Sequence, residues 1–242
     1  MRSPIIADMS PATIVPIERL DFRLVQWKWP FASERRDDIA AYFAEMQRKK
    51  PAIWNGRIFA VRHYEISDNV LRGEFFETGF AELVSWRDWG YPDPAIMTAF
   101  SMAAIETAKK SYLVGVMGSH TANAGKIYFP TGTPDRDDLV GDIVDLDRSV
   151  RRELAEETGL DFDSFKAEPG WHAVFSGQHI ALIKRLSSEE SAGALGDRVR
   201  QYLAKDSEPE FSEIRFIGAP DDLTPTVPPY VTAFLEQQWR KS

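Results

Sequence analysis

The sequence predicts an α/β fold, and three observations lead to this prediction. Segments of strand and helix character alternate along the 242 residues, and several of the strands are joined by short turns. One acidic helix, which ends before Gly159, stands among these strands. Hydrophobic residues make up 43% of the chain and charged residues 27%, which is typical of a globular protein with a sizeable core. The length fits one large domain, or one domain with a substantial extension.

The first half of the chain is expected to contain a strand, a hairpin and two helices. The strand should end at Pro30, which lacks a backbone donor, and the hydroxyl of Ser33 suits the N-cap of the helix that follows. Asp68-Asn69 is typical of the turn in a hairpin. The expected elements are a strand over 17–29, a helix over 34–49, hairpin strands over 57–67 and 70–84, and a helix over 95–109.

The second half is expected to alternate strands and helices. Asp145 or Asp147 can cap the acidic helix, because a carboxylate at that point accepts hydrogen bonds from free backbone amides. The expected strands cover 112–119, 126–129, 171–175, 178–185 and 211–217. The expected helices are the acidic one, which ends at Thr158, and two others over 187–204 and 229–240.

The acidic helix carries the chemistry that the sequence suggests. Glu153, Glu156 and Glu157 stand at i, i+3 and i+4, so their carboxylates share roughly one face. No lysine between Val150 and Lys166 offsets this charge. A hard divalent cation, which prefers oxygen ligands, would neutralise such a face.

The run from Arg152 to Leu160 resembles the second half of the Nudix box, Arg-Glu-hydrophobic-x-Glu-Glu-x-Gly-hydrophobic, and it matches every specified position. The resemblance implies a Nudix-type α/β/α sandwich with a mixed sheet, and it covers about residues 111–223. Residues 111–242 are therefore expected to form a Nudix hydrolase domain. Residues 1–110 are expected to form an N-terminal α+β extension or a small subdomain.

The first half of the box departs from the family pattern, which is Gly-x5-Glu-x7-Arg-Glu. Gly132 lies 20 residues before Arg152 instead of 14, so about six residues are inserted. Val144 stands where the pattern, counted back from the arginine, requires the first glutamate. Asp142 is the expected displaced counterpart of that glutamate.

The resemblance implies metal-dependent hydrolysis of a nucleoside diphosphate linked to another moiety, with water attacking a diphosphate phosphorus. Mg²⁺ or Mn²⁺ would be held by Glu153, Glu156 and Glu157. Arg152 would hold one of these glutamates by a charge-assisted hydrogen bond, or else form a solvent-facing pair. The general base is expected among Glu208, Glu210 and Glu213, and Glu210 is the choice included in the predicted catalytic set.

Substrate binding is predicted for Gly132, Trp86 and Trp89. Glycine at 132 would let the backbone approach a substrate closely. The two indoles could stack on a base or sugar, although packing in a core is the competing interpretation. The expected partner is a small-molecule nucleoside diphosphate derivative such as ADP-ribose, a UDP-sugar, coenzyme A, NADH or a diadenosine polyphosphate, with a nucleotide sugar or bulky dinucleotide favoured.

Composition and charge also bear on whether the protein binds nucleic acid or a membrane. A formal net charge of −8 argues against a nucleic-acid partner. No segment reaches the about 18 apolar residues of a membrane span, and the protein is expected to be cytoplasmic. A homodimer is possible by analogy with the family. The competing functions are a catalytically weak Nudix-fold module that binds a nucleotide or nucleotide sugar, and a structural protein that interacts through its aromatic N-terminal part.

Overall fold

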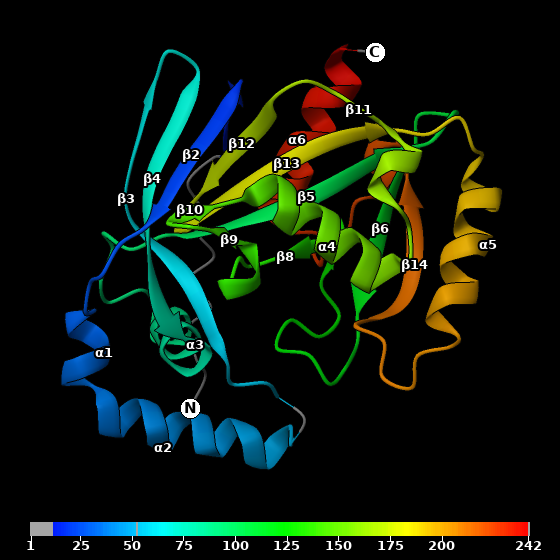
Figure 1. Cartoon of the computed structure of the whole chain (residues 1–242). Coiled ribbons are helices and arrows are strands. Elements are labelled where there is room, and N and C mark those ends of the chain that lie inside the picture. Colours follow the sequence, from blue (N-terminus) through cyan, green and yellow to red (C-terminus); the bar gives the residue numbers. More distant parts are fainter. Residues whose placement is uncertain (1–11, 52, 242) are drawn as a thin grey trace.

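Two mixed β-sheets form the centre of the computed structural model, which describes residues 12–51 and 53–241 (Figure 1). The larger sheet has nine strands in the order β1-β12-β13-β5-β6-β14, and three short strands, β11, β8 and β7, pair with β13, β5 and β6. Its strands are β1 Thr13–Ile17, β5 Thr98–Glu106, β6 Tyr112–Met117, β7 Ile127–Tyr128, β8 Thr131–Gly132, β11 Lys166–Ala167, β12 Trp171–Ser176, β13 His179–Ser187 and β14 Phe211–Ile217. The central pair β13 and β5 is parallel, and the other pairs are antiparallel.

The smaller sheet joins segments from both halves of the chain. It has five strands in the order β3-β4-β2-β10-β9. Its strands are β2 Arg19–Leu24, β3 Arg57–Ser67, β4 Val70–Gly79, β9 Leu139–Val140 and β10 Ile143–Val144. The hairpin formed by β9 and β10 is held to β2 through the pairing of Ile143 with Arg23.

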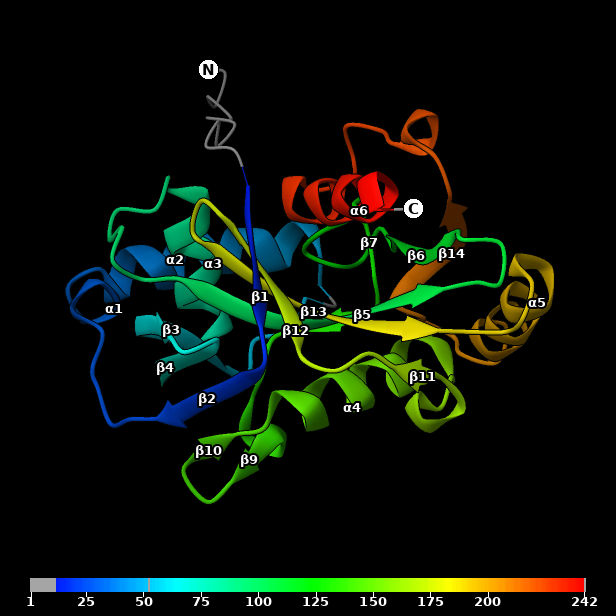
Figure 2. The ribbon, with the colours of Figure 1, turned by 90° about the horizontal axis from the view of Figure 1, so that it is seen from above.

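Helices cover both faces of the larger sheet. The helices are α1 Pro30–Glu34, α2 Arg36–Lys49, α3 Phe80–Asp88, α4 Leu146–Thr158, α5 Ala192–Leu203 and α6 Pro229–Lys241, and the 3-10 turns are η1 Arg136–Asp138, η2 Phe162–Ser164 and η3 Pro220–Asp222. Figure 2 shows α4 and α6 on opposite sides of the sheet. The predicted α/β/α sandwich with a mixed sheet is confirmed.

Each face of the larger sheet has its own apolar core. On one face, Val150 and Leu154 of α4 belong to a cluster that includes Ala103 and Ile105 of β5. On the other face, the α6 side chains pack with residues of β6 and β12, and Phe234 is fully buried there. Burial of these side chains holds α4 flat against the sheet, so the polar side of the helix keeps a fixed position.

No helix in the described ranges 12–51 and 53–241 is long and apolar enough to cross a membrane.

The helix expected over 95–109 is wrong, because Thr98–Glu106 is strand β5. The composition of this segment, with Met102, Ala103 and Ala104, favours a helix. The strand lies between β13 and β6, under helices on both faces, and nearly all of its side chains are buried. A strand covered on both faces shows no alternation of apolar and polar residues, and tertiary packing decides its structure.

Two expectations near the N-terminus also need correction. The strand expected over 17–29 is only partly present, because Ile17 ends β1 in the larger sheet, β2 in the smaller sheet covers Arg19–Leu24, and residues 25–29 form no strand. Ser33 is no N-cap, since α1 already begins at Pro30 and the Ser33 hydroxyl donates to the carbonyl of Trp29. The hairpin joined at Asp68-Asn69 and the strand over 211–217 are confirmed, but the second hairpin strand, expected over 70–84, ends at Gly79, where helix α3 follows.

The expected division of the chain near residue 110 stays a prediction. Strand β5, which precedes that boundary, lies in the middle of the larger sheet, and β1 pairs with β12 in the same sheet. The smaller sheet in turn contains β9 and β10, which follow the boundary. Backbone pairing therefore joins the two expected parts on both sheets.

Candidate active site

Helix α4 has clear local signals at both ends. The Asp145 carboxylate accepts a hydrogen bond from the backbone amide of Arg148 at 3.0 Å, so Asp145, one of the two predicted caps, is the N-cap. Gly159 ends the helix with a φ of 67°, a left-handed conformation that glycine adopts without strain. On α5, the hydroxyl of Tyr202 donates to the carbonyl of Glu156 at 3.0 Å and satisfies one carbonyl of the last turn.

Glu157 is the buried acid of α4, with only 4% of its surface exposed. Its Oε2 accepts a hydrogen bond from the amide of Thr131 at 2.8 Å. Its Oε1 is buried and has no hydrogen-bond partner among the described residues. Burial, followed by the nearby carboxylates of Glu210 and Glu153, raises the pKa of Glu157 well above its ordinary value.

Glu153 lies one turn before Glu157 and faces the same strand, β8. Burial raises its pKa to about 7, against the opposing effect of Arg152. A Cβ added at Gly132 would lie 1.8 Å from the Glu153 Oε1 atom. The missing side chain at Gly132 therefore leaves the space that the Glu153 carboxylate occupies. Substrate contact at Gly132, which the sequence suggested, stays a prediction.

Replacing Gly132 with alanine is expected to displace the Glu153 carboxylate, because the new methyl group would occupy its position. The end of a flexible glutamate can move, so the thermal midpoint should change little while turnover falls about tenfold or more. Thermal unfolding and steady-state kinetics on one preparation would check this. Gly125→Ala is the matched control, since a Cβ there meets nothing within 4 Å, although its φ of 76° adds some backbone strain. Equal loss of turnover in both variants would contradict the expectation.

Arg152 holds three carboxylates together. Its Nη1 donates to Glu156 at 3.0 Å, and its Nη2 lies 2.9 Å from the Glu153 Oε1. Its Nε and Nη2 donate to the two oxygens of Asp138 at 3.3 and 3.0 Å. Asp138 is completely buried, so this forked contact is the most enclosed of the three.

Asp138 also explains the inserted residues of the box. Five residues separate Gly132 from Asp138, the spacing that the family pattern has between its glycine and first glutamate. The hairpin of β9 and β10 then spans residues 139–144, and seven residues follow before Arg152. The insertion is therefore this six-residue hairpin, and an aspartate stands at the position of the first acid.

Asp142 does not have the position that the sequence analysis expected. It lies in the turn of the inserted hairpin, and its exposed carboxylate pairs with Arg23 of β2 at 2.8 Å. Counting back from Arg152 could not find Asp138, because the hairpin lies between that acid and the helix. Counting forward from Gly132 would have found Asp138.

Glu210 is the predicted base that lies beside the α4 acids. It immediately precedes β14, its backbone carbonyl accepts from the amide of Gly118 at 2.7 Å, and its carboxylate lies close enough to Glu157 to raise the pKa of that residue. Glu213 instead pairs with Arg215 on the surface. Of the three predicted candidates, only Glu210 is placed against Glu157.

Tyr128 of β7 is a site residue that the sequence analysis missed. It is 4% exposed, and burial raises the pKa of its phenol, with Glu157 and Glu210 among the charges that add to the effect. Asn123 has an opposing effect on this pKa. A tyrosine in a short apolar strand carries no sequence signal beyond that of a core residue.

The two predicted stacking tryptophans are packed inside the N-terminal part. Trp86 is fully buried, and its indole N–H donates to the carbonyl of Asp93 at 3.0 Å, so it cannot stack on a ligand. Trp89 packs edge-on against Phe31 and Tyr42. Core packing, the competing interpretation, therefore describes both side chains.

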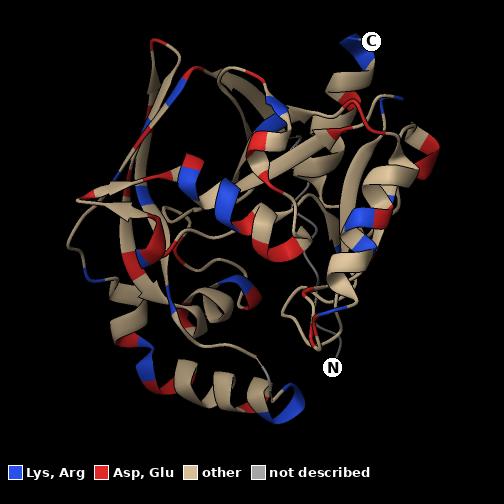
Figure 3. Ribbon diagram, turned by 45° about the vertical axis from the view of Figure 1, so that its right-hand side comes forward, with Lys and Arg blue, Asp and Glu red and all other residues tan. Residues whose placement is uncertain are grey.

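The acids of α4 and Glu210 form a carboxylate cluster without a preformed metal site. Figure 3 shows the acidic residues at the C-terminal end of α4. In residues 12–51 and 53–241, no three acidic or histidine side chains are arranged at metal-binding distances. Glu156 lies on the solvent side, with 59% of its side chain exposed. The bare Oε1 of Glu157 and its two carboxylate neighbours nevertheless supply the oxygen donors that a hard divalent cation prefers.

Comparisons with known proteins find similarity among solved structures. No protein-family model and no curated protein matches the sequence. The MutT protein from Methanosarcina mazei Go1 is 20% identical, with 60% of this chain and 94% of that chain covered and a TM-score of 0.40. The Nudix hydrolase RenU from M. smegmatis is 13% identical, with 60% and 84% covered and a TM-score of 0.38. NrtR from Shewanella oneidensis, whose structure was solved with a 27mer DNA, is 15% identical, with 59% and 61% covered and a TM-score of 0.38.

These TM-scores lie below 0.5 and carry no argument about the activity of this chain. The residues themselves supply that argument, through the motif on α4 and the acid at 138. The motif on α4 resembles the second half of the Nudix box.

Proposed function

We propose that the protein is a metal-dependent hydrolase of nucleoside diphosphates linked to another moiety, in which water attacks a diphosphate phosphorus. The observation that supports this most directly is the buried carboxylate of Glu157, which keeps one oxygen without a partner beside Glu153 and Glu210. A buried bare oxygen of this kind is costly unless a ligand satisfies it. A divalent cation would do so and would explain why three acids share this site.

Glu153, Glu157 and the more exposed Glu156 are the residues that would hold Mg²⁺ or Mn²⁺. When bound, such an ion neutralises diphosphate oxygens and lowers the pKa of a coordinated water. The amide of Thr131 fixes one oxygen of Glu157 and so aims the other. Arg152 positions Glu153 and Glu156, since its Nη2 and Nη1 contact one carboxylate each.

Glu210 is proposed as the group that takes the proton from the attacking water. It reaches Glu157 from outside the helix, on the loop before β14. Its backbone carbonyl is bonded to Gly118, which limits the movement of that loop. A carboxylate within hydrogen-bond reach of the site is suited to general base catalysis.

The competing function, a binding module without turnover, loses its main support. An acid missing at Val144 and an insertion within the box would favour such a module. Asp138 supplies a buried acid at the expected distance from Gly132, and the insertion is a hairpin outside the helix. We therefore propose an enzyme.

The purified protein is expected to release a monophosphate from at least one member of a panel of nucleoside diphosphate derivatives in the presence of Mg²⁺ or Mn²⁺. The panel should contain ADP-ribose, UDP-sugars, coenzyme A, NADH and diadenosine polyphosphates. Product analysis with a chelator control shows whether turnover needs the ion. Binding of a nucleotide with metal, seen as thermal protection without any product in the same tube, would contradict the proposal and support the binding module.

The other proposals concern nucleic acid, cellular location and oligomeric state. The absence of a nucleic-acid partner rests on the net charge of −8. Location in the cytoplasm and formation of a homodimer stay predictions.

A further inference from the structure

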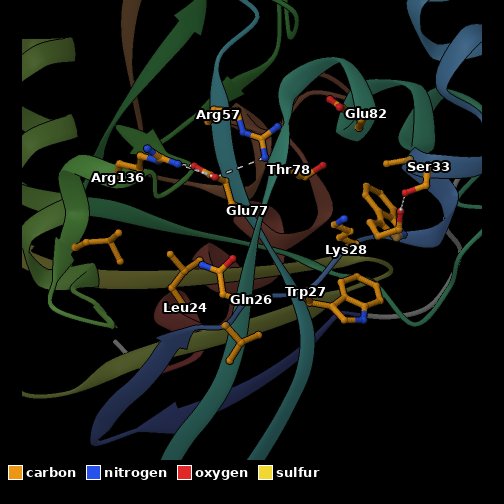
Figure 4. A pocket seen from close by; sticks show the side chains of 14 residues that line it. Leu24, Gln26, Trp27, Lys28, Ser33, Arg57, Glu77, Thr78, Glu82 and Arg136 are labelled. Carbon is orange, nitrogen blue, oxygen red and sulfur yellow. Dashed lines mark hydrogen bonds and ion pairs between the residues drawn. The ribbon is translucent and has the colours of Figure 1, made fainter.

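A pocket of about 490 Å³ lies between the inserted hairpin and the N-terminal part of the chain (Figure 4). Its walls come from the segment between β2 and α1, from β3 and β4, and from η1 and the start of β9. The lining includes Trp27, Lys28, Arg57, Glu77, Arg136 and Leu139. Its size is that of a small-molecule site.

The pocket is locally positive in an acidic protein. Its lining contains three cations, Lys28, Arg57 and Arg136, and two carboxylates, Glu77 and Glu82. The whole chain has a formal net charge of −8. An excess of positive charge in a concave site attracts an anion, even where the rest of the surface repels it.

The three cations keep unused donors. Figure 4 shows Arg57 and Arg136 converging on Glu77, whose carboxylate accepts from Nε and Nη2 of Arg136 at 2.5 and 2.9 Å and lies 3.6 Å from Nη2 of Arg57. One carboxylate thus holds two guanidinium groups in place. In the part of the chain that the structure describes, Lys28 forms no ion pair and the other nitrogens of the two arginines form no further hydrogen bond.

An apolar wall faces these charges. Trp27 is half-buried, its ring packs edge-on against Phe76 with the centroids 4.6 Å apart, and the guanidinium of Arg62 lies 5.3 Å from its centroid. Leu24 and Leu139 also line the pocket. A rigid aromatic side chain beside fixed cations suits a ring that carries an acidic group.

The pocket is connected to the carboxylate site through η1. Arg136 lines the pocket, and Asp138 in the same turn holds Arg152 of α4. Arg136 follows Gly132 by four residues, so their Cα atoms lie at most about 14 Å apart. A ligand with its diphosphate at Glu157 and a bulky group beyond it can therefore approach both places.

We propose that this pocket binds an anionic group, a carboxylate or a phosphate, on the moiety that the diphosphate links to the nucleoside. This inference rests on the proposed hydrolase function. The helix motif handles the diphosphate, whereas the pocket is built by the inserted hairpin and the N-terminal part. The anionic group would displace no existing ion pair, because Lys28 and the remaining arginine nitrogens are the donors that it would use.

Two matched substrate pairs test the proposal. UDP-glucuronate has a carboxylate on the sugar where UDP-glucose has a hydroxymethyl group, and ADP-ribose 1″-phosphate differs from ADP-ribose in one phosphate on the terminal ribose. The wild-type protein should prefer the anionic member of at least one pair, and the pair shows which anion is recognised. Lys28→Gln should lower kcat/KM for that member about fivefold to tenfold, mainly through KM. The kcat/KM of the member without the additional anionic group should change by no more than about twofold.

Lys109→Gln is the control, since Lys109 is an exposed lysine in the turn after β5 and does not line the pocket. Calorimetric dissociation constants of the four compounds for the metal-free protein provide a readout that needs no turnover. If the protein turned over both members of each pair equally well, or if Lys28→Gln had no effect, the pocket assignment would be wrong. The proposed hydrolase function would be unaffected by either result. Absence of turnover for these four compounds and for the rest of the panel would overturn the proposed hydrolase function, and the dissociation constants would still test the pocket.

Discussion

Replacing Glu157 with glutamine is expected to lower turnover at least about 10²-fold and to stabilise the metal-free protein. Glutamine keeps the shape of the side chain and can still accept from the amide of Thr131, but it cannot supply a charged ligand to a cation. In the metal-free protein the same change removes a buried carboxylate that faces Glu153 and Glu210. Stability and activity should therefore change in opposite directions.

The stabilisation should depend on pH. The pKa of Glu153 is raised to about 7, and that of Glu157 is raised well above its ordinary value, so the folded protein binds protons more tightly than the unfolded chain. The contribution of Glu153 to stability is present below the ordinary glutamate pKa and is lost as the pH rises through about 7, and Glu157 acts in the same direction. The thermal midpoint of the metal-free wild type should thus decrease as the pH rises from 5 to 8, and that of Glu157→Gln should decrease less.

The pH dependence of the thermal midpoint can be measured by thermal unfolding at several pH values, with and without Mn²⁺. The metal should raise the midpoint of the wild type at pH 8 and have little effect on Glu157→Gln. Glu189→Gln is the control, because Glu189 is exposed and lies away from α4. Full turnover by Glu157→Gln would show that this residue is no principal metal ligand.

The parts of the fold that the sequence predicted are those with local signals. Helix α4 could be placed because Asp145 caps it and Gly159 ends it. Strand β14 could be placed because it is short and rich in phenylalanine and isoleucine, which favour strands. Strand β5 could not, because a central strand buried on both faces is stabilised by its neighbours and not by its own pattern.

The candidate site was predictable to the same extent. Glu153 and Glu157 follow from their spacing on one helix, which needs no knowledge of the rest of the chain. Trp86 was misassigned because the sequence does not distinguish a tryptophan that stacks on a ligand from one that is buried in a core. Asp138 was missed because a hairpin separates it from Arg152 in the sequence. Only the structure shows that this hairpin pairs with β2 and that Asp138 still contacts Arg152.

Replacing Asp138 with alanine is expected to reduce both stability and turnover. The change removes the buried partner of Arg152 and leaves a guanidinium that is only partly solvated. Loss of one partner from a buried pair costs about 3–5 kcal/mol, and the 23% exposure of the Arg152 side chain brings the expected cost to about 2–3 kcal/mol. Turnover should fall about 10-fold to 10²-fold, because Arg152 also positions Glu153 and Glu156. Denaturant unfolding and steady-state kinetics measure the two effects.

The inserted hairpin supplies a matched control, Asp142→Ala. Asp142 stands four residues after Asp138 and also pairs with an arginine, but both partners are exposed, and solvent screens such a pair. Its loss should leave unfolding and turnover unchanged, whereas Asp138→Glu should recover part of the activity lost in Asp138→Ala. If Asp142→Ala reduced turnover and Asp138→Ala did not, the first acid of the motif would be Asp142, and the hairpin would belong inside the catalytic loop. The comparison of these two aspartates therefore decides where the insertion lies relative to the chemistry, which neither the spacing nor the helix motif alone can do.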